Sequence, residues 1–188
     1  EREVEQALRT LQADLDGATD HQDLGEILQS GIQNKLHLER CAVAVVDGSE
    51  LLVAVGGGSP GIHRWWKEVT TAKAKLTGFL GLPEVVGETG VRLLPLPDLL
   101  AADQYVAAQM LDAPDQNLGA VLLGPKQTGR LFISGDLEFL KRGTELAVRR
   151  LEKLSLARRI AGEKIRRRQL DELSKMKDDF LSRVAHDL

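Results

Sequence analysis

The sequence predicts an α+β fold: an antiparallel β-sheet flanked by helices, followed by one long C-terminal helix. Three observations predict it. Apolar residues near the N-terminus recur every three or four positions, which is the spacing of amphipathic helices. Short β-branched runs follow, and the turns between them are too short for the crossovers that parallel strands need. Residues 149–188 contain no proline and a single glycine, as expected for an uninterrupted helix.

The first two elements are predicted to be amphipathic helices. The first carries apolar residues at positions 4, 8, 11 and 15, and Asp16-Gly17 ends it. Asp20 can cap the second helix, because its carboxylate can accept a hydrogen bond from a backbone N–H of the first turn. The apolar stripe of the second helix consists of Leu24, Ile27, Leu28, Ile32 and Leu36.

A β-hairpin and a variable middle come next. Residues 41–46 and 51–55 are predicted to pair around Asp47-Gly48. The glycines at 56–58 lack the Gly-Lys-Ser/Thr ending of a phosphate loop, so we interpret them as a turn. Residues 62–80 are expected to be helical. The remaining strands are expected at residues 91–94, 104–111 and 118–123, with a turn over 113–117 and a final helix starting near Ser134 or Asp136.

The final helix is expected to continue from residue 136 to residue 188. At about 1.5 Å per residue it would be about 80 Å long. Its apolar stripe has no partner within the chain, so we expect a parallel coiled coil with a second copy, and hence a homodimer. The spacing departs from a strict heptad near Gly162 and residues 166–168, which predicts a stutter or a locally weak part of the coil.

The distribution of charge marks where this helix leaves the body of the chain. Residues 149–183 hold twelve Lys and Arg against six Asp and Glu, a net charge of +6 in a chain of net charge −3. We expect one domain over residues 1–148, a linker helix over residues 149–176, and the start of another domain over residues 177–188. Acidic residues interleave with the basic run 166–168, which favours a solvated coiled-coil face over a surface for anionic lipid or nucleic acid.

Composition excludes several classes of function. The net charge of −3 argues against a nucleic-acid partner. A single cysteine excludes an internal disulfide, and its place at the start of an apolar strand favours a core role for Cys41 over redox sensing. No metal site is expected, and no nucleophile, base and orienting group cluster in the sequence of the body. No apolar run reaches the roughly 20 residues that span a bilayer, so we expect a cytoplasmic protein.

Two stretches near the end of the body carry a recognisable pattern. Residues 118–126 (LGAVLLGPK) form a glycine-punctuated strand, and residues 129–140 (GRLFISGDLEFL) lead into a helix. This pattern resembles the end of a GAF domain, and residues 24–55 resemble its beginning. The resemblance covers about residues 20–148 and implies a GAF fold, with a PAS-like sensor domain as the alternative. Cys41 lacks the Cys-His pairing of bilin-carrying GAF domains, which argues against a covalent chromophore.

In GAF domains the variable middle lines a ligand pocket, so the resemblance implies a candidate pocket here. Two explanations of its residues stay open: a lid or wall for a small ligand that remains unidentified, or a core tryptophan beside solvated polar neighbours. The candidate ligand-binding residues are His63, Arg64, Trp65, Trp66, Tyr105 and Met110.

The last twelve residues (KDDFLSRVAHDL) resemble the H-box of dimeric sensor histidine kinases. By this resemblance His186 is the phosphoacceptor, and Asp187 orients its imidazole and serves as general base. The matching positions are Phe180, Leu181, Val184, Ala185, His186, Asp187 and Leu188.

The resemblance implies a sensory region of a two-component system that relays a signal from a GAF domain to His186. Its partners would be a second copy, a response regulator and an ATP-binding domain that uses ATP and Mg²⁺. Because the chain starts at Glu1 and ends inside the H-box, we expect it to be a fragment that is inactive alone. The alternative is a ligand-free GAF module that serves dimerisation and docking.

Overall fold

The computed structural model describes residues 2–48, 50–56, 60–71, 76–87 and 94–188. Contacts between residues divide the chain into two units, Glu1–Glu152 and Lys153–Leu188. The helices are α1 (Arg2–Gly17), α2 (His21–Leu36), α3 (Pro60–Thr71), α4 (Pro83–Val86), α5 (Asp98–Ala102) and α6 (Ser134–Asp187). The strands are β1 (Cys41–Asp47), β2 (Glu50–Val55), β3 (Phe79–Gly81), β4 (Ala107–Asp112) and β5 (Asn117–Leu123).

The first unit is built on a five-stranded sheet in the order β2-β1-β5-β4-β3. Each pair of neighbours is antiparallel: Val43 of β1 lies opposite Val55 on one side and Val121 on the other. The edge strand β3 pairs with β4 through Phe79 and Gln109. The expected α+β class, with an antiparallel sheet flanked by helices and a long C-terminal helix, is therefore confirmed.

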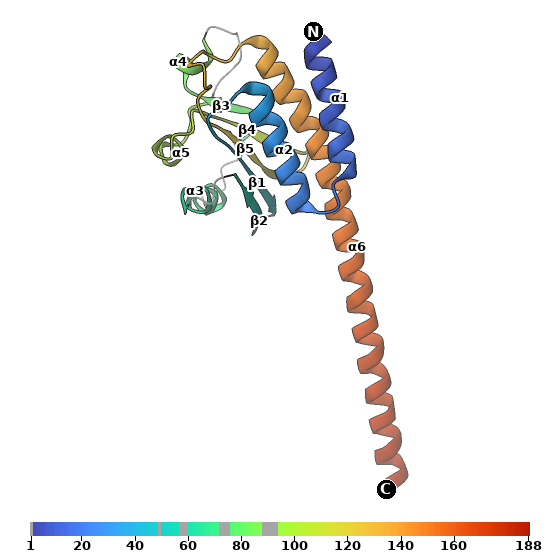
Figure 1. Ribbon diagram of the computed structural model, residues 1–188. Helices are drawn as coiled ribbons and strands as arrows, with labels where there is room; N and C mark the ends of the chain where they lie inside the picture. The colour runs from blue at the N-terminus through green and yellow to red at the C-terminus, as the bar shows by residue number, and fades with distance from the viewer. Residues whose placement is uncertain (1, 49, 57–59, 72–75, 88–93) are drawn as a thin grey trace. The chain divides into compact units, whose positions relative to one another are not determined.

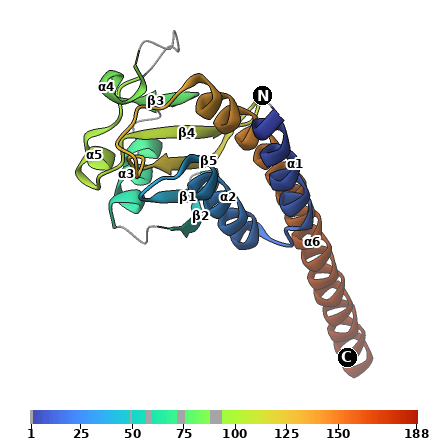
Figure 2. The same cartoon turned by 45° about the horizontal axis from the view of Figure 1, so that its top comes forward.

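Helices cover both faces of this sheet (Figures 1 and 2). α2 packs on β1 and β2, and α1 packs on α2, with the first part of α6 on the same side. Leu11 of α1 fills the space left by two glycines, Gly31 of α2 and Gly143 of α6, where an added Cβ would lie 2.9 and 3.2 Å from its methyl carbons. The guanidinium of Arg142 on α6 also pairs with Glu5 on α1 and lowers the pKa of that carboxyl. α3 and α5 cover the opposite face of the sheet.

The two predicted helix starts are confirmed by their hydrogen bonds. The carboxylate of Asp20 accepts a hydrogen bond from the backbone N–H of Asp23 at 2.8 Å, which caps α2. At the start of α6, the carboxylate of Asp136 accepts the backbone N–H of Ile133 at 2.9 Å and pairs with Lys126. This ion pair is largely buried, so it fixes the beginning of α6 against the loop that follows β5.

The expected helix over residues 62–80 is wrong at its C-terminal end. α3 ends at Thr71, and Phe79–Gly81 form the edge strand β3. Gly78 has a φ of +72°, a left-handed conformation that does not occur inside a right-handed helix, and its carbonyl accepts the backbone N–H of Met110 at 2.9 Å. Residues 79–81 therefore form a strand because they pair with β4, although their local apolar spacing is typical of a helix.

Two further strand predictions need correction or lie outside the structure. The strand expected over residues 104–111 starts at Ala107, because Gln104 has a φ of +64° and closes the turn after α5. Of the strand expected over residues 91–94, residues 91–93 lie outside the described residues. Leu94 forms a single parallel bridge to Leu80, at the β3 edge of the sheet.

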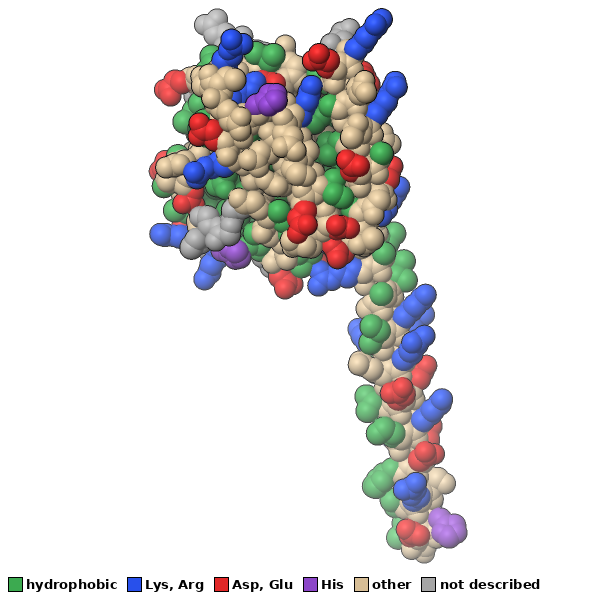
Figure 3. All heavy atoms as spheres, viewed as in Figure 1, with side chains coloured by type: hydrophobic (Ala, Val, Ile, Leu, Met, Phe, Trp, Pro, Cys, Tyr) green, Lys and Arg blue, Asp and Glu red, His purple; other side chains and the backbone are tan. Residues whose placement is uncertain are grey.

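The second unit, Lys153–Leu188, is helical as far as Asp187. Every residue from position 156 to position 188 is exposed. Its large apolar side chains follow one another along the helix, as the space-filling view shows (Figure 3). None of the described helices is long and apolar enough to cross a membrane.

Candidate functional site

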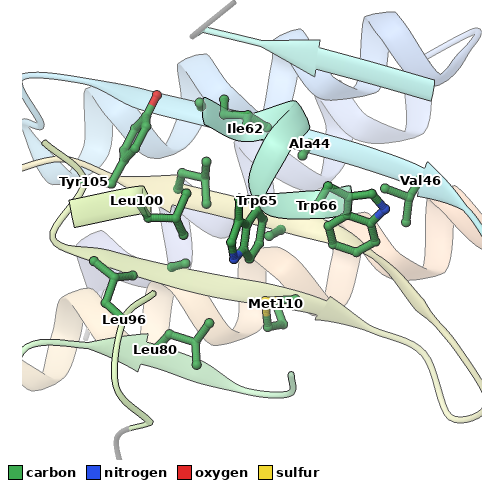
Figure 4. Close-up of a cluster of buried hydrophobic side chains, with 14 residues drawn as sticks. Ala44, Val46, Ile62, Trp65, Trp66, Leu80, Leu96, Leu100, Tyr105 and Met110 are labelled. Atoms are coloured by element: carbon green, nitrogen blue, oxygen red, sulfur yellow. The ribbon is translucent and has the colours of Figure 1, made fainter. Parts of the chain in front are cut away.

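The first candidate site is an aromatic cluster between α3 and the sheet (Figure 4). Trp65 and Trp66 are 1% and 4% exposed, and their rings meet edge to face with centroids 5.6 Å apart and planes at 72°. Strands present alternate residues to one face, and on this face β1, β4 and β5 carry alanines where the indoles pack. Small side chains on the sheet therefore make the room that two large side chains on α3 fill. The alanines that face the cluster are Ala42, Ala44, Ala108 and Ala120.

The structure brings four of the six predicted ligand-binding residues together. Trp65, Trp66, Tyr105 and Met110 are buried in this one cluster, with Ile62, Leu80, Leu96 and Leu100. Burial raises the pKa of the Tyr105 hydroxyl above its ordinary value. The indole N–H of Trp65 is buried and has no hydrogen-bond partner among the described residues.

The other two predicted residues do not join this cluster. His63 and Arg64 are exposed, and the Arg64 guanidinium lies 3.4 Å from the Glu68 carboxylate one helical turn further along α3. Since α3 is amphipathic, its two tryptophans face the sheet while His63 and Arg64 face solvent. A ligand role for the buried four stays a prediction.

Sequence reasoning missed the sheet side of the cluster. Ala42 and Ala44 alternate with Val43 and Val45 along β1, so small and branched side chains point to opposite faces of the sheet. That alternation is visible in the sequence and could have indicated which face receives the tryptophans.

The second candidate site lies at the end of α6. His186 and Asp187 are 91% and 83% exposed, and the imidazole Nδ1 lies 3.6 Å from the Asp187 carboxylate oxygen. At about 100° per residue, His186 is about 120° around the helix from Phe180 and about 160° from Val184. The imidazole is thus separated from the apolar stripe and is open to an approaching partner.

Among the residues that the structure describes, no group of three or more His, Cys, Asp or Glu side chains is arranged to hold a metal ion. Cys41 is buried at the start of β1, and burial raises the pKa of its thiol to about 12. A thiol that stays protonated is a poor nucleophile and a poor metal ligand. A catalytic role for the exposed His186–Asp187 pair stays a prediction.

Comparison of the sequence with protein-family models and with curated proteins gives no match. Solved structures, however, share the fold. The GAF domain of the potassium sensor histidine kinase KdpD from Escherichia coli matches with a TM-score of 0.57 and 19% identity, over 82% of this chain and 97% of that one. The chromophore-binding domain of an unusual bacteriophytochrome from R. palustris matches with a TM-score of 0.57 and 12% identity, over 84% of this chain.

This chain spans 64% of that bacteriophytochrome chain, which is less than two thirds. The GAF domain of a phosphoenolpyruvate-protein phosphotransferase from Acinetobacter matches with a TM-score of 0.50 and 12% identity, over 80% of this chain and 93% of that one. At these identities the likeness establishes the fold. The chain therefore contains a domain with the GAF fold, and a long helix that ends at the His186–Asp187 pair.

Proposed function

We propose that the chain is the sensory and dimerisation region of a two-component sensor histidine kinase, in which the GAF domain relays a signal to the phosphoacceptor His186. The observation that carries the proposal is the H-box pattern around an exposed imidazole with a carboxylate beside its Nδ1. The GAF fold on the N-terminal side supports it, because GAF domains of signalling proteins share that fold. In this proposal the protein acts in the cytoplasm, where ATP and the response regulator are found.

The proposed chemistry is transfer of the γ-phosphoryl group of ATP to histidine. The Asp187 carboxylate, 3.6 Å from Nδ1, would need only a small movement to accept a hydrogen bond from Nδ1–H, which would favour the tautomer that leaves the lone pair of Nε2 free. Nε2 forms the N–P bond as the bond from the γ-phosphorus to its bridging oxygen breaks and ADP leaves. The Nδ1 proton can pass to Asp187 as the ring gains positive charge. ATP and Mg²⁺ would be held by an ATP-binding domain of the full-length kinase, and a response regulator would then take the phosphoryl group.

A homodimer through the C-terminal helix is part of this proposal. The exposed side chains of Leu173, Met176 and Phe180 lie at helical spacing, and burying each against a second helix is worth roughly 1.5–3 kcal/mol. Pairing would leave His186 outside the seam, where an ATP-binding domain can reach it.

Phosphorylation of the full-length kinase tests the phosphoacceptor. We expect His186→Gln to abolish incorporation of label from γ-labelled ATP, and the label in the parent protein to be acid-labile, as phosphohistidine is. His21→Gln, which changes a histidine at the start of α2, serves as the matched control and should retain labelling. Persistent labelling of the His186→Gln protein would exclude the assignment.

The second candidate function is a ligand-free module for dimerisation and docking. The observation that favours it is the burial of Trp65 and Trp66, whose indoles occupy the face of the sheet that carries the alanines. Native mass spectrometry of the purified protein discriminates the two functions. A bound small molecule that is lost on substitution of Tyr105 or Met110 supports sensing, whereas a ligand-free protein that still signals supports the docking module.

A further inference from the structure

The unit Lys153–Leu188 exposes ten large apolar side chains, yet these do not form one continuous stripe. Leu173, Met176 and Phe180 fit positions a, d and a of a heptad. Counting back in the same heptad places Arg159 and Arg166 at position a, and Gly162 and Gln169 at position d. The seam is therefore apolar beyond residue 170 and polar over residues 158–169. The exposed apolar side chains of the unit are Leu156, Ile160, Ile165, Leu170, Leu173, Met176, Phe180, Leu181, Val184 and Leu188.

The flanking positions of this heptad suit a second copy in parallel. In a parallel pair, position g of one helix meets position e of the partner five residues later. Glu172 would then face Lys177 of the second copy, and Ile165 would face Leu170. The same rule brings Arg158 toward Glu163. Each of these pairs is complementary in charge or in apolar character. Antiparallel helices would instead pair g with g and e with e, so this set of pairs exists only in the parallel arrangement.

The polar part of the seam opposes close pairing. Two-fold symmetry would place Arg159 against its own copy and Arg166 against its own copy. Like charges in contact destabilise a helix pair. Gly162, at position d between the two arginines, has no side chain to insert into the facing helix. Ile160 lies at position b, away from the seam, so its side chain does not replace the missing apolar layer.

Beyond Phe180 the apolar residues step by four, to Val184 and then to Leu188. Such a stutter turns the seam relative to a strict heptad and keeps it on the face opposite His186. The side chains that pair and the side chain proposed to accept phosphate therefore occupy different faces of the helix.

We propose that this unit pairs in parallel with the same helix of a second copy from about residue 170 onward, and that residues 158–169 form an interrupted seam that holds the two helices apart. The inference deepens the proposed function and rests on its dimer, because it specifies where the dimer is closed and where it can rearrange. A weakly paired segment beside a well-packed one can adopt alternative packings, and this makes it the place where a signal can change the pairing near His186.

Disulfide cross-linking of the full chain tests this arrangement. We expect Met176→Cys to cross-link two copies under mild oxidation, and Gly162→Cys to do so at least tenfold more slowly. Lys175→Cys, next to Met176 but at the outward position c, is the control and should not cross-link. The native Cys41 is buried and does not interfere. Equal rates at positions 162 and 176 would overturn the interrupted seam, and absence of cross-linking at position 176 would overturn the pairing.

Two sets of charge variants test the register. Glu172→Lys should weaken the dimer, and adding Lys177→Glu should restore it, as measured by sedimentation equilibrium. Arg159→Leu with Arg166→Leu should lower the dimer dissociation constant at least tenfold, because the seam becomes apolar. An unchanged constant would overturn the proposal. Cross-linking does not depend on phosphate transfer, so His186→Gln should leave it unaltered, and failure of the phosphoacceptor assignment is seen separately.

Discussion

Trp65 and Trp66 can be buried because the residues opposite them are small. Ala42, Ala44 and Ala120 lie within the same cluster, and none of them is exposed. Protein interiors are packed as densely as organic crystals, so a large side chain on α3 needs small side chains on the sheet. If the indoles fill this space completely, no room remains for a ligand, and a docking module is favoured. Open space beside them would favour a sensing domain.

Ala120→Leu tests how completely the indoles fill their space. We expect a loss of about 1–3 kcal/mol in the free energy of unfolding, measured by urea denaturation, because added methylene groups force the indoles to shift. Ala13→Leu, at an exposed position of α1, is the control and should change it by less than about 0.5 kcal/mol. Unchanged stability of the Ala120 variant would mean that open space remains beside the tryptophans, which would favour ligand binding.

Cys41 makes the stability of the domain depend on pH. Burial raises the pKa of its thiol from 9.0 to about 12. The folded protein therefore holds the thiol proton at pH values where the unfolded chain loses it. The associated stability is fully present below about pH 9 and declines as pH rises toward 12.

The free energy of unfolding should therefore be about 1 kcal/mol lower at pH 10 than at pH 8. Urea denaturation at pH 8 and pH 10 measures it. Cys41→Ala should lose less stability between these two pH values than the parent protein does. Equal slopes in both proteins would contradict the contribution of Cys41.

At the scale of elements, the contact between β1 and β5 depends on one backbone conformation. Gly119 has a φ of +143°, and a Cβ at this position would lie 1.9 Å from the carbonyl oxygen of Ala44. β5 is central in the sheet, so a distortion here affects its pairing with both β1 and β4. The glycine of the pattern that resembles the last GAF strand therefore has a steric reason.

Gly119→Ala should destabilise the domain by at least about 1–3 kcal/mol, the usual cost of a strained backbone conformation. The melting temperature measured by circular dichroism checks this. Gly135→Ala is the matched control, because nothing lies within 4 Å of the added Cβ in the first turn of α6. That variant should be neutral or slightly more stable, since alanine favours helix. A neutral Gly119→Ala would show that β1 and β5 approach less closely than described.

At the scale of the whole molecule, the two units differ in what stabilises them. Glu1–Glu152 contains the sheet and the buried cores on both of its faces. Lys153–Leu188 buries little of its own surface, and Ser155 is its single residue counted as buried. An isolated helix of this kind is only marginally stable in water, so its order should depend on a partner.

Helix content should therefore rise with protein concentration. We expect the mean residue ellipticity at 222 nm of the full chain to become more negative as dimers form, since pairing suppresses fraying of the exposed helix. A chain truncated after Glu152 should fold cooperatively and show no such dependence. Concentration-independent ellipticity of the full chain would contradict pairing through this helix.

The sequence by itself determined the elements whose signals are local. The Asp20 cap, the hairpin of β1 and β2, the strand β5 and the long helix α6 all follow from periodicity, turn residues and composition. The exposed position of His186 beside Asp187 follows from a motif of adjacent residues.

Tertiary structure alone decided what depends on partners distant in the chain. Residues 79–81 form a strand because their backbone pairs with β4. The two tryptophans pack in one core with Tyr105 and Met110, because alanines from β1, β4 and β5 leave space for them on the side of α3 that faces the sheet. His63 and Arg64 lie on the other side of α3 and are exposed to solvent.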